Sequence, residues 1–361
     1  MNLEQRAKLQ SLIDWAIEND IDEDELPRDV VRLSNLTMIE FNDYNISELP
    51  ESFSSLSNIL ALKITRCPLT KFPECISRLE KLTFLTLEQC QVSKLPEWID
   101  RLQYLRTLNL EGNALTRIPD SVGNLSKLER ITLSGNKLKL LPNTVSRLSH
   151  LTQLDISGNF FQQFPEVVED IVLLSQLNLS WNSLTELPSD LSSMKNLTEI
   201  NLSFNRFEQF PKGLCTITSL KDVIFSHNRL SKITPSIGTM TQLVSLYLFA
   251  NEISALPETI CDLSQLVLLD LSDNQLTTLP KCIGGLANLE ILTVDENIIT
   301  RLPNSIGDLK KLMVLRINNN QIEKLPDSVK SLISLREMIF DEYKVKNAEK
   351  LSKLNNYTDL Y

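Results

Sequence analysis

The feature that most constrains this chain is a repeat of constant length. Asparagine recurs every 23 residues from Asn113 to Asn320, with no insertion or deletion between copies. Other residues hold the same phase at the two ends: Tyr44, Cys67, Cys90 and Tyr343. An apolar residue followed by proline recurs at the same interval, except at Ile233-Thr234. A unit this short cannot bury a core alone, so the units must stack against one another.

One unit shows what each position contributes. Residues 266–276 read L-x-x-L-x-L-x-x-N-x-L, and residues 279–286 read L-P-x-x-I-x-x-L. Leu269 and Leu271 alternate with polar neighbours, which predicts a short strand with one face in the core. The Asn274 amide can satisfy backbone groups of adjacent turns. Proline fixes φ and removes a donor, which favours an irregular or 3₁₀ return segment.

These motifs resemble the leucine-rich repeat family, and the 23-residue type is similar to Ras-suppressor-like and small bacterial proteins. The resemblance covers residues 26–343 as thirteen full units. It implies an α/β repeat solenoid, a horseshoe with a parallel concave β-sheet and an irregular or 3₁₀ convex side. It also implies protein binding rather than catalysis, with signal transduction as one use of such binding.

The two ends depart from the repeat, as solenoid ends do. Residues 1–25 are predicted to form a capping helix, and its apolar stripe has the spacing i, i+3, i+4, i+7, i+8. This stripe comprises Leu9, Leu12, Ile13, Ala16 and Ile17. Residues 344–361 are predicted to form a C-terminal cap and tail.

Charge and hydropathy limit which partners the chain is expected to bind and in which compartment it is expected to occur. The formal net charge is −10, which disfavours binding to nucleic acid through a general positive field. No stretch is apolar enough to span a membrane, and the N-terminus lacks the pattern of a signal peptide. We therefore expect a cytoplasmic protein, with translocation or secretion by a signal-independent route as the alternative.

The sequence lacks the common motifs of catalysis and metal binding. It has no glycine-rich phosphate loop, G-x-S-x-G, H-E-x-x-H or C-x-x-C, and its two histidines are His150 and His227. We expect no enzyme activity, no cofactor and no metal site.

The six cysteines are expected to be free thiols in a reducing compartment. Cys67 and Cys90 share the asparagine phase in adjacent units, so their side chains should point inward in parallel, too far apart for a bridge. Other cysteines of equal phase are separated by two or nine units, namely Cys215 from Cys261 and Cys75 from Cys282.

Function in a repeat scaffold must come from positions that the repeat does not dictate. The position before the asparagine holds three glycines, then Trp181, Phe204 and His227, and later the acids Asp273 and Glu296. Same-phase residues of parallel strands lie about 5 Å apart, which predicts one contiguous ledge of rings. The predicted binding residues on the concave face are Trp181, Phe204, Arg206, His227, Arg229, Tyr247, Phe249, Asp273 and Glu296. Two interpretations remain open, namely a binding patch and rings that merely stack to shield the sheet.

The favoured hypothesis is a scaffold that binds a protein or peptide partner through this ledge. One alternative is a bacterial effector or adhesin exported without a cleavable signal. Another is a signalling scaffold of the Ras-suppressor type.

Overall fold

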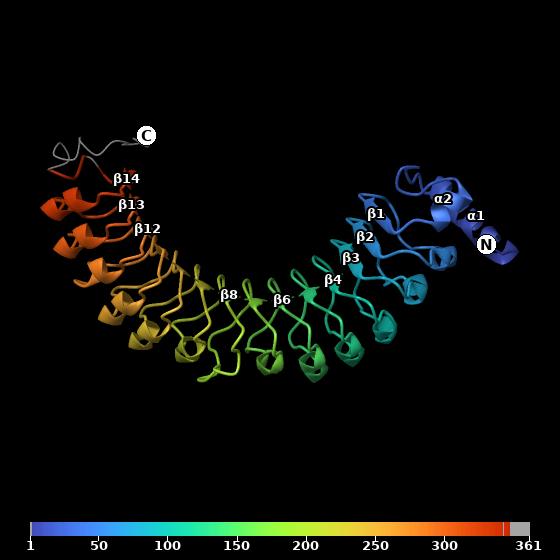
Figure 1. Cartoon of the computed structure of the whole chain (residues 1–361), viewed down its shortest axis with the longest axis horizontal. Helices are drawn as coiled ribbons and strands as arrows, with labels where there is room; N and C mark the ends of the chain where they lie inside the picture. The colour runs from blue at the N-terminus through green and yellow to red at the C-terminus, as the bar shows by residue number, and fades with distance from the viewer. Residues whose placement is uncertain (1, 342, 347–361) are drawn as a thin grey trace. The chain divides into compact units, whose positions relative to one another are not determined.

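The computed structural model describes residues 2–341 and 343–346, and the chain divides into two compact units. The first comprises residues up to 161 together with 165–178, and the second comprises 162–164 and the residues from 179 onward. Within each unit, short parallel strands follow one another in chain order and are joined by return segments on the side away from the strands (Figure 1).

The strands of the first unit are β1 (Met38–Asn42), β2 (Ala61–Thr65), β3 (Phe84–Glu88), β4 (Thr107–Asn109), β5 (Arg130–Thr132), β6 (Gln153–Asp155) and β7 (Gln176–Asn178). Those of the second unit are β8 (Glu199–Asn201), β9 (Asp222–Ile224), β10 (Ser245–Tyr247), β11 (Leu268–Asp270), β12 (Ile291–Thr293), β13 (Val314–Arg316) and β14 (Glu337–Ile339). Partners along the sheet differ by 23 residues, as in Leu246 opposite Leu269 and Leu269 opposite Leu292. The predicted parallel sheet of constant register is confirmed within each unit.

The return segments carry 3₁₀ turns, as the prolines predicted. In the first unit they are η1 (Glu51–Ser55), η2 (Glu74–Arg78), η3 (Glu97–Arg101), η4 (Asp120–Asn124), η5 (Asn143–Arg147) and η6 (Glu166–Asp170). In the second unit they are η7 (Lys212–Thr216), η8 (Pro235–Thr239), η9 (Glu258–Asp262), η10 (Ile283–Gly285), η11 (Asn304–Asp308) and η12 (Asp327–Ser331). Most begin after a proline in extended conformation, because a fixed φ near −70° leads directly into the turn.

The core lies between the strands and these turns. Leu269 and Leu271 are fully buried, while Leu268 and Asp270 are only partly covered, so the alternation predicted for this strand is confirmed. The four phenylalanines at core phases are also buried, namely Phe161, Phe164, Phe207 and Phe210. Burial of such side chains contributes about 25 cal/mol per Å² of apolar surface, and every unit shares that gain with its neighbours.

The asparagine column forms a ladder of buried amides. Asn205 is 8% exposed, its Nδ2 donates to the carbonyl oxygens of Leu179 and Leu202 at 3.0 and 3.1 Å, and its Oδ1 accepts from Leu184 N at 2.9 Å. One side chain thus serves backbone groups of two repeats. Buried polar groups left without such partners would cost about 1–3 kcal/mol each.

The N-terminal cap consists of α1 (Leu3–Glu18) and α2 (Val30–Ser34), which cover the start of the first unit (Figure 1). Asn2 caps α1, its side chain accepting a hydrogen bond from Gln5 N at 2.7 Å. Four residues of the predicted stripe are buried, but Ile17 is 57% exposed, so its prediction as a core residue is wrong. Ile17 lies about 80° around the helix from Leu9, at the margin of the stripe.

The C-terminal end of the array shows a second correction. Tyr343 has the phase of the asparagine column, yet its side chain is fully exposed, so it does not extend the ladder beyond Asn320. Val345 is buried beside it. Most of the predicted cap at 344–361 lies outside the described residues, from 347 onward. Among the described helices, none is both long enough and apolar enough to cross a bilayer.

The prediction of six free thiols is wrong. Cys261 and Cys282 form a disulfide with a Cα–Cα distance of 5.9 Å. The other four cysteines are free and buried, namely Cys67, Cys75, Cys90 and Cys215. The absence of a bridge between Cys67 and Cys90 is therefore confirmed, but sequence reasoning compared only cysteines of equal phase.

The disulfide follows from an offset between neighbouring return segments. A Cβ added at Gly307 would lie 2.2 Å from the carbonyl oxygen of Ser328, which is 21 residues later. A Cβ added at Gly284 would likewise lie 2.2 Å from the carbonyl oxygen of Ser305, again 21 residues later. Cys261 occupies this glycine column, and Cys282 lies 21 residues after it. On the turn side, residue i therefore meets residue i+21 rather than i+23.

Candidate functional site

The column before each asparagine has left-handed backbone throughout. Its φ values are 54° at Trp181, 54° at Phe204 and 53° at His227, and glycine holds the same position in three units of the first half. A backbone hydrogen bond to the next repeat holds this conformation, because Phe204 N donates to Ser226 O at 3.0 Å. A side chain in left-handed backbone costs about 1–2 kcal/mol, and glycine avoids that cost. Three consecutive bulky rings therefore occupy a position that the backbone favours for glycine.

The rings form a stack that runs along the second unit. The Trp181 and Phe204 centroids lie 3.8 Å apart at 10°, and those of Phe204 and His227 lie 4.0 Å apart at 16°. Phe249 meets His227 edge-on at 4.9 Å and 87°. We call these four residues the ring stack. The predicted contiguous ledge is confirmed as geometry.

The ring stack remains open to solvent along its edges. Trp181 is 60% exposed, and Phe204, His227 and Phe249 are half-buried. Phe204 has a ring against each face, so self-stacking accounts for part of the arrangement. It does not cover the indole of Trp181, which keeps apolar surface in contact with water.

Tyr247 lies on β10 beside the ring stack, between Ile224 and Asp270 in the sheet register. Burial raises the pKa of the Tyr247 phenol, and the negative charges of Asp222 and Asp270 raise it further. The hydroxyl therefore stays protonated at neutral pH. It can donate and accept hydrogen bonds on the face of the sheet that points away from the core.

The acids predicted as the rim lie farther along the same column. Asp273 and Glu296 are exposed in left-handed backbone, and Ala250 separates them from His227. The neighbouring Asp295 is different, being only 8% exposed and bound by Arg316 Nε at 2.9 Å. Its partial burial raises the pKa of Asp295, although the Arg316 charge opposes that effect. Asp273 and Glu296 thus differ from Asp295 in being open to solvent.

Arg206 and Arg229 lie on the segments that leave the strands, two residues past Phe204 and His227, and both are exposed. Arg206 also borders a groove of about 670 Å³ within the second unit. The groove is lined by Thr185, Glu186, Leu187, Arg206, Glu208, Gln209, Phe210, Pro211, Lys212, Lys232, Ile233, Thr234 and Pro235.

Sequence reasoning did not find this groove, although its signal was present. The apolar-proline pattern fails only at Ile233-Thr234, where Pro235 comes one residue late, and these three residues are part of the groove lining. The cysteine pair was missed as well. Of the nine predicted residues, the structure brings Trp181, Phe204, His227 and Phe249 into contact with one another. Tyr247 lies on β10, and Arg206 borders the groove.

Comparison with known protein families gives matches along most of the chain. A profile described as a leucine-rich repeat region matches residues 73–157 and 258–361. Two further leucine-rich repeat profiles match residues 218–276, and residues 173–194 with 196–217. A search of curated protein sequences found no match.

Solved structures of the same architecture include bacterial and plant proteins. A leucine-rich repeat protein of Leptospira interrogans is 27% identical with a TM-score of 0.73, over 89% of this chain and 94% of that one. An internalin from Listeria monocytogenes is 19% identical with a TM-score of 0.73, over 94% and 96% of the chains, which indicates the fold alone. The plant peptide hormone receptor RGFR1, in complex with RGF2, is 26% identical with a TM-score of 0.62, over 84% and 54%.

Proposed function

Because this chain belongs to the leucine-rich repeat family, we propose that it is a non-enzymatic scaffold that binds a protein or peptide partner through the ring stack. Leucine-rich repeat proteins are generally binding scaffolds without catalytic activity. One solved relative of this fold is a peptide hormone receptor in complex with RGF2, which supports a peptide as the class of partner.

The observation that carries the proposal is the position of the rings. Trp181, Phe204 and His227 occupy left-handed backbone, where each side chain costs about 1–2 kcal/mol relative to glycine. Left-handed backbone recurs at every position of this column, so what sets these three positions apart is the bulky rings that they carry there. A partner that covers the exposed edge of Trp181 buries apolar surface, and the free energy of that burial offsets the cost of the left-handed backbone.

The surroundings indicate what kind of partner fits. The ring edges suit an apolar or aromatic anchor, since Trp and Arg are enriched among residues that dominate binding energy. Arg206 and Arg229 are exposed two residues past Phe204 and His227, and Asp273 and Glu296 follow farther along the column. A partner segment with an apolar centre, acidic groups that face Arg206 and Arg229, and a basic end that faces Asp273 and Glu296 matches this layout.

The test begins with peptides selected from a displayed random library on the immobilised wild-type chain. Their affinities are then measured for Trp181→Ala and for Phe204→Ala. We expect each substitution to weaken binding by about 2 kcal/mol or more, as at interface hot spots. Trp98→Ala is the matched control, because Trp98 packs on Phe72 on the turn side. Equal loss in the control, or full binding by Trp181→Ala, would contradict the proposal.

A second candidate is a bacterial effector or adhesin that is exported without a cleavable signal. The disulfide between Cys261 and Cys282 favours it, because disulfides persist mainly in oxidising compartments. A signalling scaffold of the Ras-suppressor type, kept in the cytoplasm, predicts instead that the pair is reduced in cells. Trapping thiols with an alkylating agent in intact source cells, followed by mass spectrometry, distinguishes the two.

A further inference from the structure

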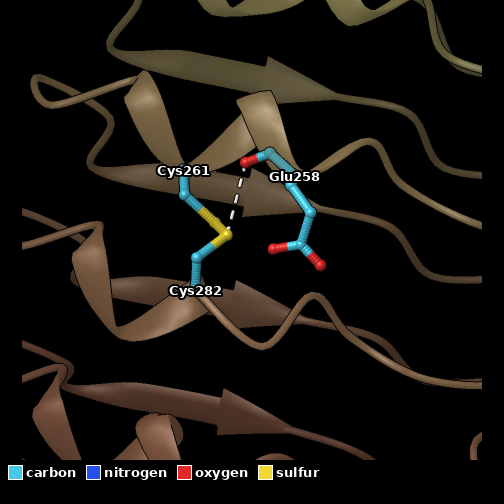
Figure 2. Close-up of a disulfide and its surroundings, with 3 residues drawn as sticks. All are labelled: Glu258, Cys261 and Cys282. Atoms are coloured by element: carbon cyan, nitrogen blue, oxygen red, sulfur yellow. Dashed lines mark hydrogen bonds between the residues drawn. A yellow bond between two sulfur atoms is a disulfide. The ribbon is translucent and has the colours of Figure 1, made fainter.

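A cluster of two cysteines and one glutamate lies on the turn side of the second unit, away from the ring stack. Glu258 begins η9, Cys261 lies on the same turn, and Cys282 immediately precedes η10 (Figure 2). The two sulfur atoms and one carboxylate oxygen of Glu258 all lie within 4.8 Å of one another. Both cysteines are half-buried and Glu258 is exposed, so solvent and ions can reach the cluster.

These two cysteines differ from the other four in accessibility. The others are buried, and burial raises the pKa of Cys75 and of Cys215 to about 12 and that of Cys90 to about 11. The thiolate is the form that ligates metals and exchanges disulfides, so at neutral pH those buried thiols react far more slowly than accessible ones. Thiol chemistry at the surface of this chain therefore concentrates at Cys261 and Cys282.

We propose that Cys261, Cys282 and Glu258 form a zinc site when the disulfide is reduced, so that zinc replaces the disulfide as the cross-link between η9 and η10. The ligands suit this ion, because zinc takes thiolate sulfur at about 2.3 Å and carboxylate oxygen at about 2.0–2.2 Å in tetrahedral geometry. The sequence predicts no metal site, because it lacks C-x-x-C and histidine-rich patterns. The i to i+21 contact on the turn side creates this one.

The backbone already has the spacing that the site needs. Two thiolates on one tetrahedral zinc lie about 3.8 Å apart, given zinc–sulfur bonds of about 2.3 Å. The Cα atoms of Cys261 and Cys282 are 5.9 Å apart, so side-chain rotation can separate the sulfur atoms without moving the turns. The Glu258 carboxylate supplies the third ligand from the same turn as Cys261, and water completes the fourth position.

The exchange between the two states balances with a small disulfide, such as oxidised glutathione, as oxidant. One zinc-bound thiolate attacks the small disulfide and forms a mixed disulfide, releasing one small thiolate. The second cysteine thiolate attacks the mixed disulfide, forming the Cys261–Cys282 bond and releasing the other small thiolate. Two electrons pass from the protein to the oxidant, two protons from solvent convert the products to thiols, and the zinc ion leaves.

The test uses the full chain, reduced and kept without oxygen, titrated with zinc chloride against a chromophoric chelator. We expect one zinc ion per chain in the wild type and none in Cys261→Ser/Cys282→Ser. Glu258→Gln should bind at least tenfold more weakly, and Cys215→Ser, which changes a buried thiol, should bind like the wild type. Binding by the double serine variant that equals the wild type would overturn the proposal, as would no binding by the reduced wild type.

A second measurement keeps the test independent of variant folding. Zinc should raise the melting temperature of the reduced wild type, because an ion that binds only the folded state stabilises it. It should not change the melting temperature of the oxidised wild type, and oxidised glutathione should release the bound zinc. An equal zinc effect on both redox forms would contradict the proposal. Either result leaves peptide binding by the ring stack to be judged on its own assay.

Discussion

Two opposing effects act at Phe204: ring contacts stabilise the fold, and the left-handed backbone destabilises it. Replacing Phe204 by alanine and by glycine separates them. Alanine removes both ring contacts of Phe204, at 3.8 and 4.0 Å, and each such contact contributes about 0.5–1.5 kcal/mol beyond buried area. The alanine Cβ retains the strain of the left-handed backbone. We therefore expect Phe204→Ala to lower the free energy of unfolding by about 1–3 kcal/mol.

Phe204→Gly loses the same contacts but also relieves the strain. The relief of about 1–2 kcal/mol exceeds the entropic cost of glycine, which is about 0.5–1 kcal/mol. The glycine variant should thus be more stable than the alanine variant by about 0.5–1 kcal/mol, the reverse of the usual order in regular structure. Ala250, with φ of 53° and no ring of its own, is the matched control. Ala250→Gly should raise stability by the same amount.

The assay is unfolding in urea followed by circular dichroism, with the slope of free energy against denaturant compared between variants. An unchanged slope shows that the same surface is exposed on unfolding. A glycine variant at position 204 that is less stable than the alanine variant would refute the strain argument. Destabilisation by Ala250→Gly would refute it as well, because no ring contact is lost there.

Three further predictions concern the repeat framework. Asn205→Ala should lower the free energy of unfolding by about 1–3 kcal/mol in the same assay, because backbone groups of two repeats lose their hydrogen-bond partner. The control is Asn143→Ala, at an exposed asparagine. An equal loss in the control would contradict the role of the asparagine ladder. Ser236→Cys should form a disulfide with Cys215, because position 236 follows Cys215 by 21 residues as Cys282 follows Cys261; mass spectrometry that finds both thiols free after air oxidation would reject the i to i+21 contact. Burial raises the pKa of Cys75 and of Cys215 to about 12, while unfolded thiols titrate near about 8.5. The native state then retains protons that the unfolded state releases, so the melting temperature should fall as the pH rises from about 8 to about 10.5. The fall should be less steep in a Cys75→Ala/Cys215→Ala variant. Parallel curves for the two proteins would contradict this prediction.

Much of the fold could be predicted from the amino-acid pattern, because it rests on interactions that recur identically in every unit. The 23-residue interval requires Leu246 to face Leu269 along the sheet, and the alternation within one strand decides which side chains are buried. The Asn205 amide bonds to backbone of its own repeat and of the preceding one at fixed offsets, so its role could be derived from the recurrence of asparagine at one phase. The order of Trp181, Phe204 and His227 along one column also followed from phase alone.

Other features depend on how neighbouring units are offset in space, which the pattern within one unit does not encode. The pairing of Cys261 with Cys282 required the i to i+21 contact between return segments. The groove beside Arg206 required knowing where the displaced Pro235 lies, and the exposure of Ile17 depended on which part of α1 faces the core. The left-handed backbone under Phe204 arises from hydrogen bonds to the next repeat, so it becomes visible only once the repeats are stacked. Phase along the chain specifies which residues are neighbours in the sheet, whereas contacts on the turn side depend on three-dimensional offsets that no single-unit pattern records.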